Sequence, residues 1–137
     1  MTELSAYLDV PLNSAAPAAS RRVVESILRA WGYTDDSWLR TAMLVVSELV
    51  TNAVSHGGDV GALHLQTVRD QVVITAVDRS NIGPRPRQPN DQGNHRIAIV
   101  KAFSSRWGSG EYPSGKRVWV ELSPHPAQGA DPKGGMP

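Results

Sequence analysis

One run of the sequence, residues 34–58, most strongly limits what this chain can fold into. Its apolar residues recur at helical spacing: Leu39, Ala42, Met43, Val46, Leu49, Val50 and Ala53. Thr34, Asp35 and Asp36 offer N-caps before the pattern, and Gly57-Gly58 follows it as a stop. We therefore predict a long amphipathic helix whose apolar side packs against the rest of the protein.

The second half of this helix carries a polar stripe. Glu48, Asn52 and His56 lie four residues apart, which places a carboxylate, a carboxamide and an imidazole on one side of a helix. Such a stripe can simply face water, because polar edges are the default pattern of surface helices. It can also hold a hydrated magnesium ion and its phosphates, because magnesium prefers oxygen ligands and keeps several waters. Spacing alone leaves both interpretations open.

The composition indicates one ordered domain. The chain has 137 residues, of which 40% are apolar and 20% charged, and its net charge is +1. This balance argues against a disordered chain and against a direct nucleic-acid binder. Without cysteine there are no disulfides or thiolate metal ligands. No stretch has the length and hydropathy of a membrane span or a signal peptide, so we expect a cytoplasmic protein without membrane contacts.

The remaining segments predict an α+β fold. We expect an edge strand at 7–12, a helix ending at Trp31-Gly32, a hairpin of strands at 62–68 and 72–78, a long loop at 79–95, a short helix at 97–103, and strands at 105–108 and 117–123. This order implies a two-layer sandwich, with helices on one face of a mainly antiparallel sheet. Residues 1–123 would form one domain, and the Pro- and Gly-rich residues 124–137 a flexible tail.

Asp78 is the second notable polar residue. It shares one face of its strand with Val72, Ile74 and Ala76, so we expect it on the side that meets the helices. A carboxylate at a strand end can accept a hydrogen bond from an exocyclic amine such as that of adenine. It can equally be a turn residue that ends the strand.

Together, the segment Glu48-Leu49-Val50-Thr51-Asn52-Ala53-Val54-Ser55-His56 and the later Val77-Asp78 resemble the Bergerat ATP-binding fold. This superfamily includes gyrase, the ninety-kilodalton heat-shock chaperones, histidine kinases and MutL. Within it, the chain looks most like the small bacterial anti-sigma-factor serine/threonine kinases. The segments 30–32, 45–54 and 115–122 have counterparts there, and the likeness covers roughly residues 8–123.

The resemblance implies a role for each residue of the site. Glu48 would be the general base, Asn52 would bind magnesium through its side-chain oxygen, and Asp78 would hold the adenine amino group. His56 would touch phosphate or, as we favour, cap the helix end, where cations are stabilised. ATP and magnesium are thus the implied cofactors. The helix expected from residue 97 would offer its N-terminal amides to the phosphates.

The predicted lid, residues 79–95, departs from the family pattern. Ser80 stands where a glycine is usual, although Gly83 can serve as the second glycine. Gly93 fits the far end of the lid, but Arg96 replaces the glycine before the following helix; its guanidinium could bind phosphate directly. Arg117 occupies a position at which the family has a threonine close to adenine. These changes predict weakened or altered nucleotide binding.

Two functions follow from the resemblance. The first is an ATP-binding anti-sigma-factor-type regulator that sequesters a sigma factor and phosphorylates an antagonist, the anti-anti-sigma protein, on a serine. The second is a non-catalytic protein-binding module, or pseudokinase, on the same fold. Either would act through protein partners, and relatives of this type often form homodimers.

Overall fold

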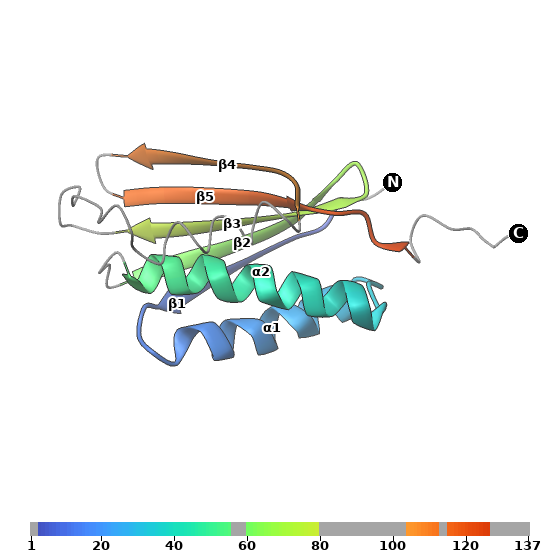
Figure 1. Ribbon diagram of the computed structural model, residues 1–137, viewed down its shortest axis with the longest axis horizontal. Coiled ribbons are helices and arrows are strands. Elements are labelled where there is room, and N and C mark those ends of the chain that lie inside the picture. Colours follow the sequence, from blue (N-terminus) through green and yellow to red (C-terminus); the bar gives the residue numbers. More distant parts are fainter. Residues whose placement is uncertain (1–2, 56–59, 80–103, 113–114, 127–137) are drawn as a thin grey trace, which may run out of the picture.

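The structure is a computed structural model that describes residues 3–55, 60–79, 104–112 and 115–126. Its elements are, in chain order, β1 (Ser5–Pro11), α1 (Ala16–Ala30), α2 (Asp36–Ser55), β2 (Val60–Val68), β3 (Gln71–Arg79), β4 (Ser104–Tyr112) and β5 (Gly115–Leu122). The strands form one antiparallel sheet in the order β1-β2-β3-β5-β4. Both helices lie on one face of this sheet (Figure 1). The predicted α+β sandwich is confirmed.

Helix α1 starts earlier than its apolar pattern indicates. Apolar residues recur at helical spacing only from Val23 onward, but the helix begins at Ala16 with Pro17 in its first turn, where proline is well tolerated. At the other end, Gly32 adopts a positive φ of 100°. The N–H of Gly32 donates to the carbonyl of Arg29, and that of Tyr33 donates to Leu28, both at 3.0 Å. This pair of bonds is a Schellman motif, which confirms the predicted stop.

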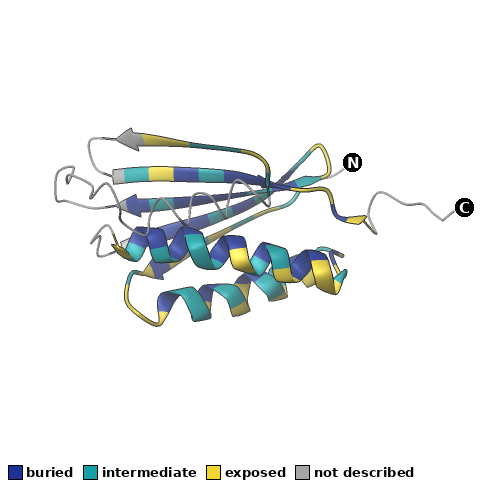
Figure 2. Cartoon of the chain, viewed as in Figure 1, coloured by how far each residue is buried: buried dark blue, intermediate teal, exposed yellow. Residues whose placement is uncertain are grey.

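Helix α2 begins as its sequence predicts. The carboxylate of Asp35 accepts a hydrogen bond from the backbone N–H of Trp38 at 2.8 Å, which satisfies one of the open donors of the first turn. The apolar side of the helix, including Leu39, Val46 and Leu49, is buried against the sheet. Figure 2 shows that the buried residues of both helices face the sheet.

The β2–β3 hairpin turns through two residues, Arg69 and Asp70, which both have positive φ, 53° and 67°. Such backbone angles at both central residues define the type I′ turn that suits the twist of paired strands. The register of the hairpin places alternate residues of each strand on the helix-facing side. There they form the core with β5, through Leu63, Leu65, Ile74, Ala76, Val118 and Val120.

The chain beyond β5 is attached to the domain, at least as far as residue 125. We expected a flexible tail from Pro124, but His125 is only 3% exposed. Its ring packs edge-on against Tyr33 and Trp38, with centroid distances of 5.2 and 4.9 Å. Its Nε2 accepts a hydrogen bond from the backbone N–H of Asp35 at 3.0 Å. The rings of Tyr33 and Trp38 thus hold this histidine against the domain.

The expected helix at 97–103 and nearly all of the expected long loop at 79–95 lie outside the described residues. Within the described part of the chain, no helix is both long and apolar enough to cross a membrane.

Candidate functional site

The polar stripe of α2 does not simply face water. Asn52 is buried, with 6% of its surface exposed, and Glu48, one turn earlier, is half-buried. Both side chains take part in polar or electrostatic interactions. A buried carboxamide costs about 1–3 kcal/mol if its hydrogen bonds are lost, so a helix rarely keeps one by chance. The surface-edge interpretation is therefore wrong for Asn52, while His56 lies outside the described residues.

Asp78 lies where the strand pattern predicts, near the end of β3 and on the helix-facing side of the sheet. It is 6% exposed and shares its face with the core residues Val72, Ile74 and Ala76. A fully solvated turn residue would not be enclosed in this way. Asp78 is thus a buried carboxylate at the margin of the core.

The C-terminal half of α2 lies over the same part of the sheet. Val50 and Ala53 of α2 line a small cavity of about 10 Å³ together with Gly61 of β2 and Ala76 and Val77 of β3. Gly61 is the direct partner of Asp78 across the β2–β3 pair. In Figure 1 the C-terminal end of α2 and the end of β3 lie at the same end of the molecule. The fold therefore brings the segment that carries Asn52 close to the strand end that carries Asp78.

Gly61 has a packing role in this arrangement. A Cβ atom there would come within 2.9 Å of the carbonyl oxygen of Val77 and 3.1 Å of Cδ2 of Leu12. The approach to the carbonyl oxygen is shorter than real Cβ contacts, and the approach to Leu12 would force that side chain to shift. The glycine lets the segment after β1 close over the sheet next to Asp78.

Lys116 is a site residue that we did not predict. The register pairs Lys116 of β5 directly with Asp78, and directly opposed residues of neighbouring strands have Cβ atoms about 5 Å apart. Lys116 is half-buried, and both residues take part in polar or electrostatic interactions. Arg117, on which our interpretation had focused, pairs with Val77, is exposed and faces the opposite side of the sheet. The sequence could have indicated which face Lys116 takes. Val118, Val120 and Leu122 alternate on the core face, and by the same alternation residue 116 lies on that face.

The described residues near the end of α2 and the end of β3 offer oxygen donors. No group of three or more His, Cys, Asp or Glu side chains that could hold a metal ion occurs among the described residues. Asn52 and Glu48 offer oxygen atoms, which fits a magnesium ion that takes most of its ligands from phosphates and water. Gly83, Gly93 and Arg96, which we expected near the phosphates, lie outside the described residues.

No family model matches the chain, and no curated protein matches it. A chain in the crystal structure of the SiaB–SiaC complex from Pseudomonas aeruginosa has a similar fold. The TM-score is 0.58, the sequence identity is 11%, and the match covers 85% of this chain and 88% of that chain. At this identity the likeness shows the fold alone. The resemblance to Bergerat-fold kinases stays a prediction that rests on the motifs of α2 and β3.

Proposed function

We propose that this protein is an ATP-binding regulator that acts through protein partners, of the anti-sigma-factor type. One observation supports the proposal most strongly. Two buried polar side chains, Asn52 of α2 and Asp78 at the end of β3, lie on segments that pack close together. Asp78 would accept a hydrogen bond from the adenine amino group, and Asn52 would bind the magnesium ion at the phosphates. The motif resemblance gives these roles, and the burial of both side chains supports them.

Within this proposal, the protein transfers a phosphoryl group from ATP to a serine of an antagonist protein. Glu48 would take the proton of the attacking hydroxyl, and its half-buried position one turn from Asn52 supports this role. The fold likeness to a chain that was crystallised in a protein complex supports action through a partner. The sigma factor and the anti-anti-sigma protein are the partner classes that the motif resemblance implies.

The position of Lys116 favours a second function, a protein-binding module without nucleotide. The ammonium group of Lys116 lies opposite Asp78 and can form an ion pair with its carboxylate. Asp78 would then stabilise the sheet and would not be available to bind adenine. The two functions differ in one measurable property, which is the binding of ATP by the unmodified protein.

Calorimetric titration with magnesium and ATP separates the two functions. We expect binding by the unmodified protein and an affinity at least about tenfold lower for Asn52→Ala and for Asp78→Asn, since a hydrogen bond to a charged group contributes about 1.5–3 kcal/mol. Ser55→Ala and Asp70→Asn are matched controls, because both side chains are exposed, on α2 and in the β2–β3 turn. They should retain the affinity of the unmodified protein.

Glu48→Gln adds the test of catalysis. It should bind ATP normally yet transfer no phosphoryl group to an antagonist, because the amide cannot accept the hydroxyl proton. Absence of ATP binding by the unmodified, folded protein would rule out the nucleotide site and leave the binding module.

A further inference from the structure

Strand β1 forms one edge of the sheet, and among the described strands it pairs with β2 alone (Figure 1). The N–H of Thr67 in β2 donates to the carbonyl of Leu4 at 2.9 Å, one step beyond Ser5 in the β1–β2 register. Hydrogen-bonded pairs alternate along an antiparallel ladder. The main-chain groups of Ser5, Tyr7 and Asp9 therefore point away from β2. Such a row of main-chain donors and acceptors is a template for a further strand.

A groove of about 270 Å³ lies beside this edge, between β1 and the first half of α1. Its walls are mostly small or apolar, and they include Leu8 and Val10 of β1 and Ala16, Ala19 and Val23 of α1. Leu8 and Val10 face the helices, and Val23 is one of three large apolar side chains that are exposed. Successive side chains of a strand alternate between its two faces. A strand added next to β1 would therefore direct every second side chain toward this groove.

One polar side chain that lines the groove is buried. Ser20 of α1 is only 5% exposed, and its hydroxyl makes no hydrogen bond with any of the described residues. A buried hydroxyl is unfavourable without a partner, so a ligand gains affinity if it supplies one. Asp9 is the only charged residue among the described residues of the lining, and its charge is negative. The groove therefore suits an uncharged group with an apolar body and one polar end.

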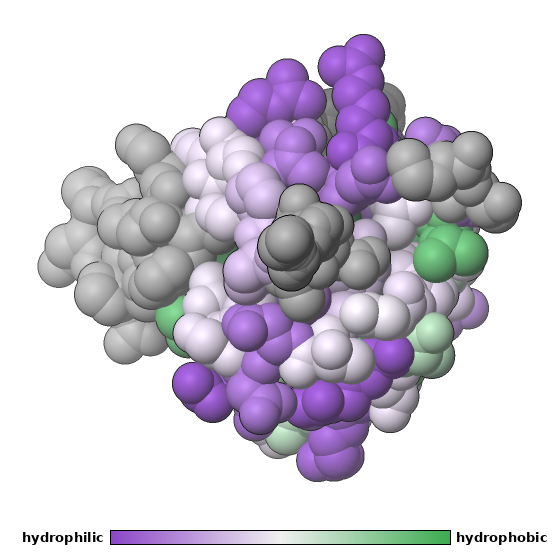
Figure 3. Space-filling model, turned by 90° about the vertical axis from the view of Figure 1, so that its right-hand side faces the viewer, coloured by the Kyte–Doolittle hydropathy of each residue, from purple (hydrophilic) through white to green (hydrophobic). Residues whose placement is uncertain are grey.

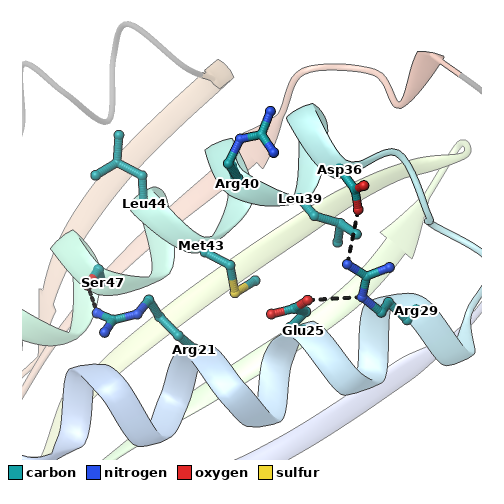
Figure 4. A pocket seen from close by; sticks show the side chains of 9 residues that line it. All are labelled: Arg21, Glu25, Arg29, Asp36, Leu39, Arg40, Met43, Leu44 and Ser47. Atoms are coloured by element: carbon teal, nitrogen blue, oxygen red, sulfur yellow. Dashed lines mark hydrogen bonds and ion pairs between the residues drawn. The ribbon is translucent and has the colours of Figure 1, made fainter.

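The larger groove, of about 530 Å³ between α1 and α2, has a different character (Figure 4). Charges of both signs alternate along it, with Arg21, Glu25 and Arg29 on α1 and Asp36 and Arg40 on α2. Arg29 already donates to Glu25 at 2.9 Å and to Asp36 at 3.2 Å. Alternating charges select no single class of ligand. The chemistry of the β1–α1 groove is more specific.

We propose that the β1–α1 groove binds an extended segment of a partner protein, which pairs with β1 as an additional strand and inserts a tyrosine. The segment runs antiparallel to β1, and the residues on either side of its tyrosine form hydrogen-bonded pairs with Tyr7 and Asp9. The tyrosine lies opposite Leu8 and thus points into the groove. Its ring is apolar, and its hydroxyl can bond to that of Ser20. This inference goes beyond the proposed nucleotide site and does not depend on it.

Two features select this occupant over others. The row of main-chain groups on β1 is satisfied by another extended chain, whereas a small free ligand in the groove would leave it unused. The negative charge of Asp9 disfavours a nucleic acid or another anionic ligand, because no cation among the described lining residues offsets it. An uncharged extended peptide meets both conditions.

Fluorescence anisotropy with a labelled seven-residue peptide tests the inference. The probe carries tyrosine at its centre and threonine on both sides of it, and the control peptide carries alanine in place of the tyrosine. We expect the full chain to bind the tyrosine peptide and to bind the alanine peptide at least about tenfold more weakly, because the aromatic ring supplies most of the buried apolar area.

Filling the groove should block the peptide. Ala19 is exposed on α1 and lines the groove, so Ala19→Trp should weaken binding at least about tenfold without disturbing the core. Ala30→Trp is the matched control, because Ala30 is exposed on the same helix and does not line the groove. It should change the affinity less than about twofold.

Methylated peptides test the strand pairing itself. Methylation of the two amides on either side of the tyrosine residue, which face β1 in the proposed pairing, should weaken binding at least about tenfold, because both donors are lost. Methylation of the amide of the tyrosine residue, which points away from β1, should change binding less than about twofold. Equal effects of the two patterns would exclude strand addition and overturn the inference.

The contact with Ser20 has its own test. Ser20→Ala should weaken binding of the tyrosine peptide about threefold to tenfold and change binding of a phenylalanine peptide less than about twofold, because only the tyrosine bonds to the serine. Equal losses with both peptides would show that the tyrosine hydroxyl does not reach Ser20 and would overturn the proposed insertion.

Three further outcomes would overturn the inference or separate it from the nucleotide site. Failure of the unmodified protein to bind the tyrosine peptide, or equal losses in Ala19→Trp and Ala30→Trp, would overturn it. A dimer of the unmodified protein that Ala19→Trp alone dissociates would also overturn it, because a second copy would then occupy the groove. Peptide binding without ATP binding would support the groove and reject the nucleotide site, and the opposite pattern would reject the groove alone.

Discussion

Asn52 and Asp78 are polar side chains at the edge of an otherwise apolar core, each with 6% of its surface exposed. Burial of such groups is costly unless every partner is present, so their positions in α2 and β3 have to be exact. The local sequence predicts both positions: helical spacing places Asn52 one turn after Glu48, and strand alternation places Asp78 on the core face. Which segments pack around these side chains depends on the tertiary fold, which local sequence patterns do not reveal.

Lys116 shows why the site could be predicted only in part. Its position opposite Asp78 depends on the register between β3 and β5, two strands separated by more than thirty residues of sequence. Strand alternation fixes which face a residue takes but leaves the partner strand undetermined. The sequence motif therefore led to Arg117, which lies on the other face of the sheet.

We predict that Lys116→Thr strengthens ATP binding about threefold to tenfold, because in the proposed site the ammonium group opposite Asp78 would compete with the adenine amino group. Arg117→Thr is the matched control, since Arg117 is exposed on the opposite face of the sheet. Titration calorimetry with magnesium and ATP measures both affinities. A gain in Arg117→Thr, or a tenfold loss in Lys116→Thr, would show that Lys116 does not compete for Asp78.

The helices and strands of the described residues follow the sequence patterns closely, because their local signals agree with one another. Asp35 caps α2, Gly32 ends α1, and the two residues Arg69 and Asp70 turn the hairpin. The start of α1 cannot be predicted from the apolar pattern, because Ala16 to Ser20 lack an apolar period. Alanine is nevertheless the strongest helix former, so the segment extends the helix.

Gly32→Ala should destabilise the protein by about 1 kcal/mol, because alanine at a φ of 100° is strained and the Schellman motif depends on that angle. Thermal unfolding followed by circular dichroism should show a melting temperature lower by several degrees. Gly110→Ala is the control: its added Cβ meets open space, and Gly32 is the only described glycine with a positive φ. Equal losses in the two variants would contradict a special role for Gly32.

The segment after β5 packs against the residues around the start of α2, about 90 residues earlier in the sequence. His125, after the last strand, is bound by Tyr33, Asp35 and Trp38 at the start of α2, and the indole Nε1 of Trp38 donates to the carbonyl of Ser123 at 2.7 Å. Composition indicated a flexible tail, since proline and glycine dominate from Pro124 onward. A single histidine between prolines forms no hydrophobic pattern, so the sequence does not predict its contact and only the tertiary structure shows it.

This contact predicts a pH-dependent stability. Burial lowers the pKa of His125 below its ordinary value of 6.5, with a smaller opposing effect from Asp35. The unfolded chain therefore binds a proton more readily than the folded one, so the stability is complete above pH 6.5 and is lost as the pH falls below it. In addition, the protonated ring could not accept the hydrogen bond of the Asp35 N–H.

Melting temperatures at pH 7 and pH 5 test this prediction, with His125→Phe as the reference. The phenylalanine keeps the aromatic packing but does not titrate, so its melting temperature should fall less between the two pH values than that of the unmodified protein. At pH 7 the variant should be about 1 kcal/mol less stable, because the Asp35 N–H loses its acceptor. Identical pH dependence of the two proteins would exclude His125 as the titrating group.

The end of the molecule at which α2 begins has no large apolar patch among its described residues. Figure 3 shows the end at which α2 begins: it is mostly hydrophilic, and its apolar residues form small separate spots among the described ones. The residues that line the α1–α2 groove are all different from those that line the small cavity beside Asn52 and Asp78.

The most direct test of the nucleotide site is a titration of the isotopically labelled protein with magnesium and ATP, followed by backbone amide chemical shifts. The proposed site predicts the largest shifts in the C-terminal half of α2 and at the end of β3, around Asn52, Gly61, Asp78 and Lys116. Amides of the α1–α2 groove, such as that of Arg40, should move far less. Absence of shifts, or shifts concentrated away from Asn52 and Asp78, would contradict an ATP site between α2 and β3.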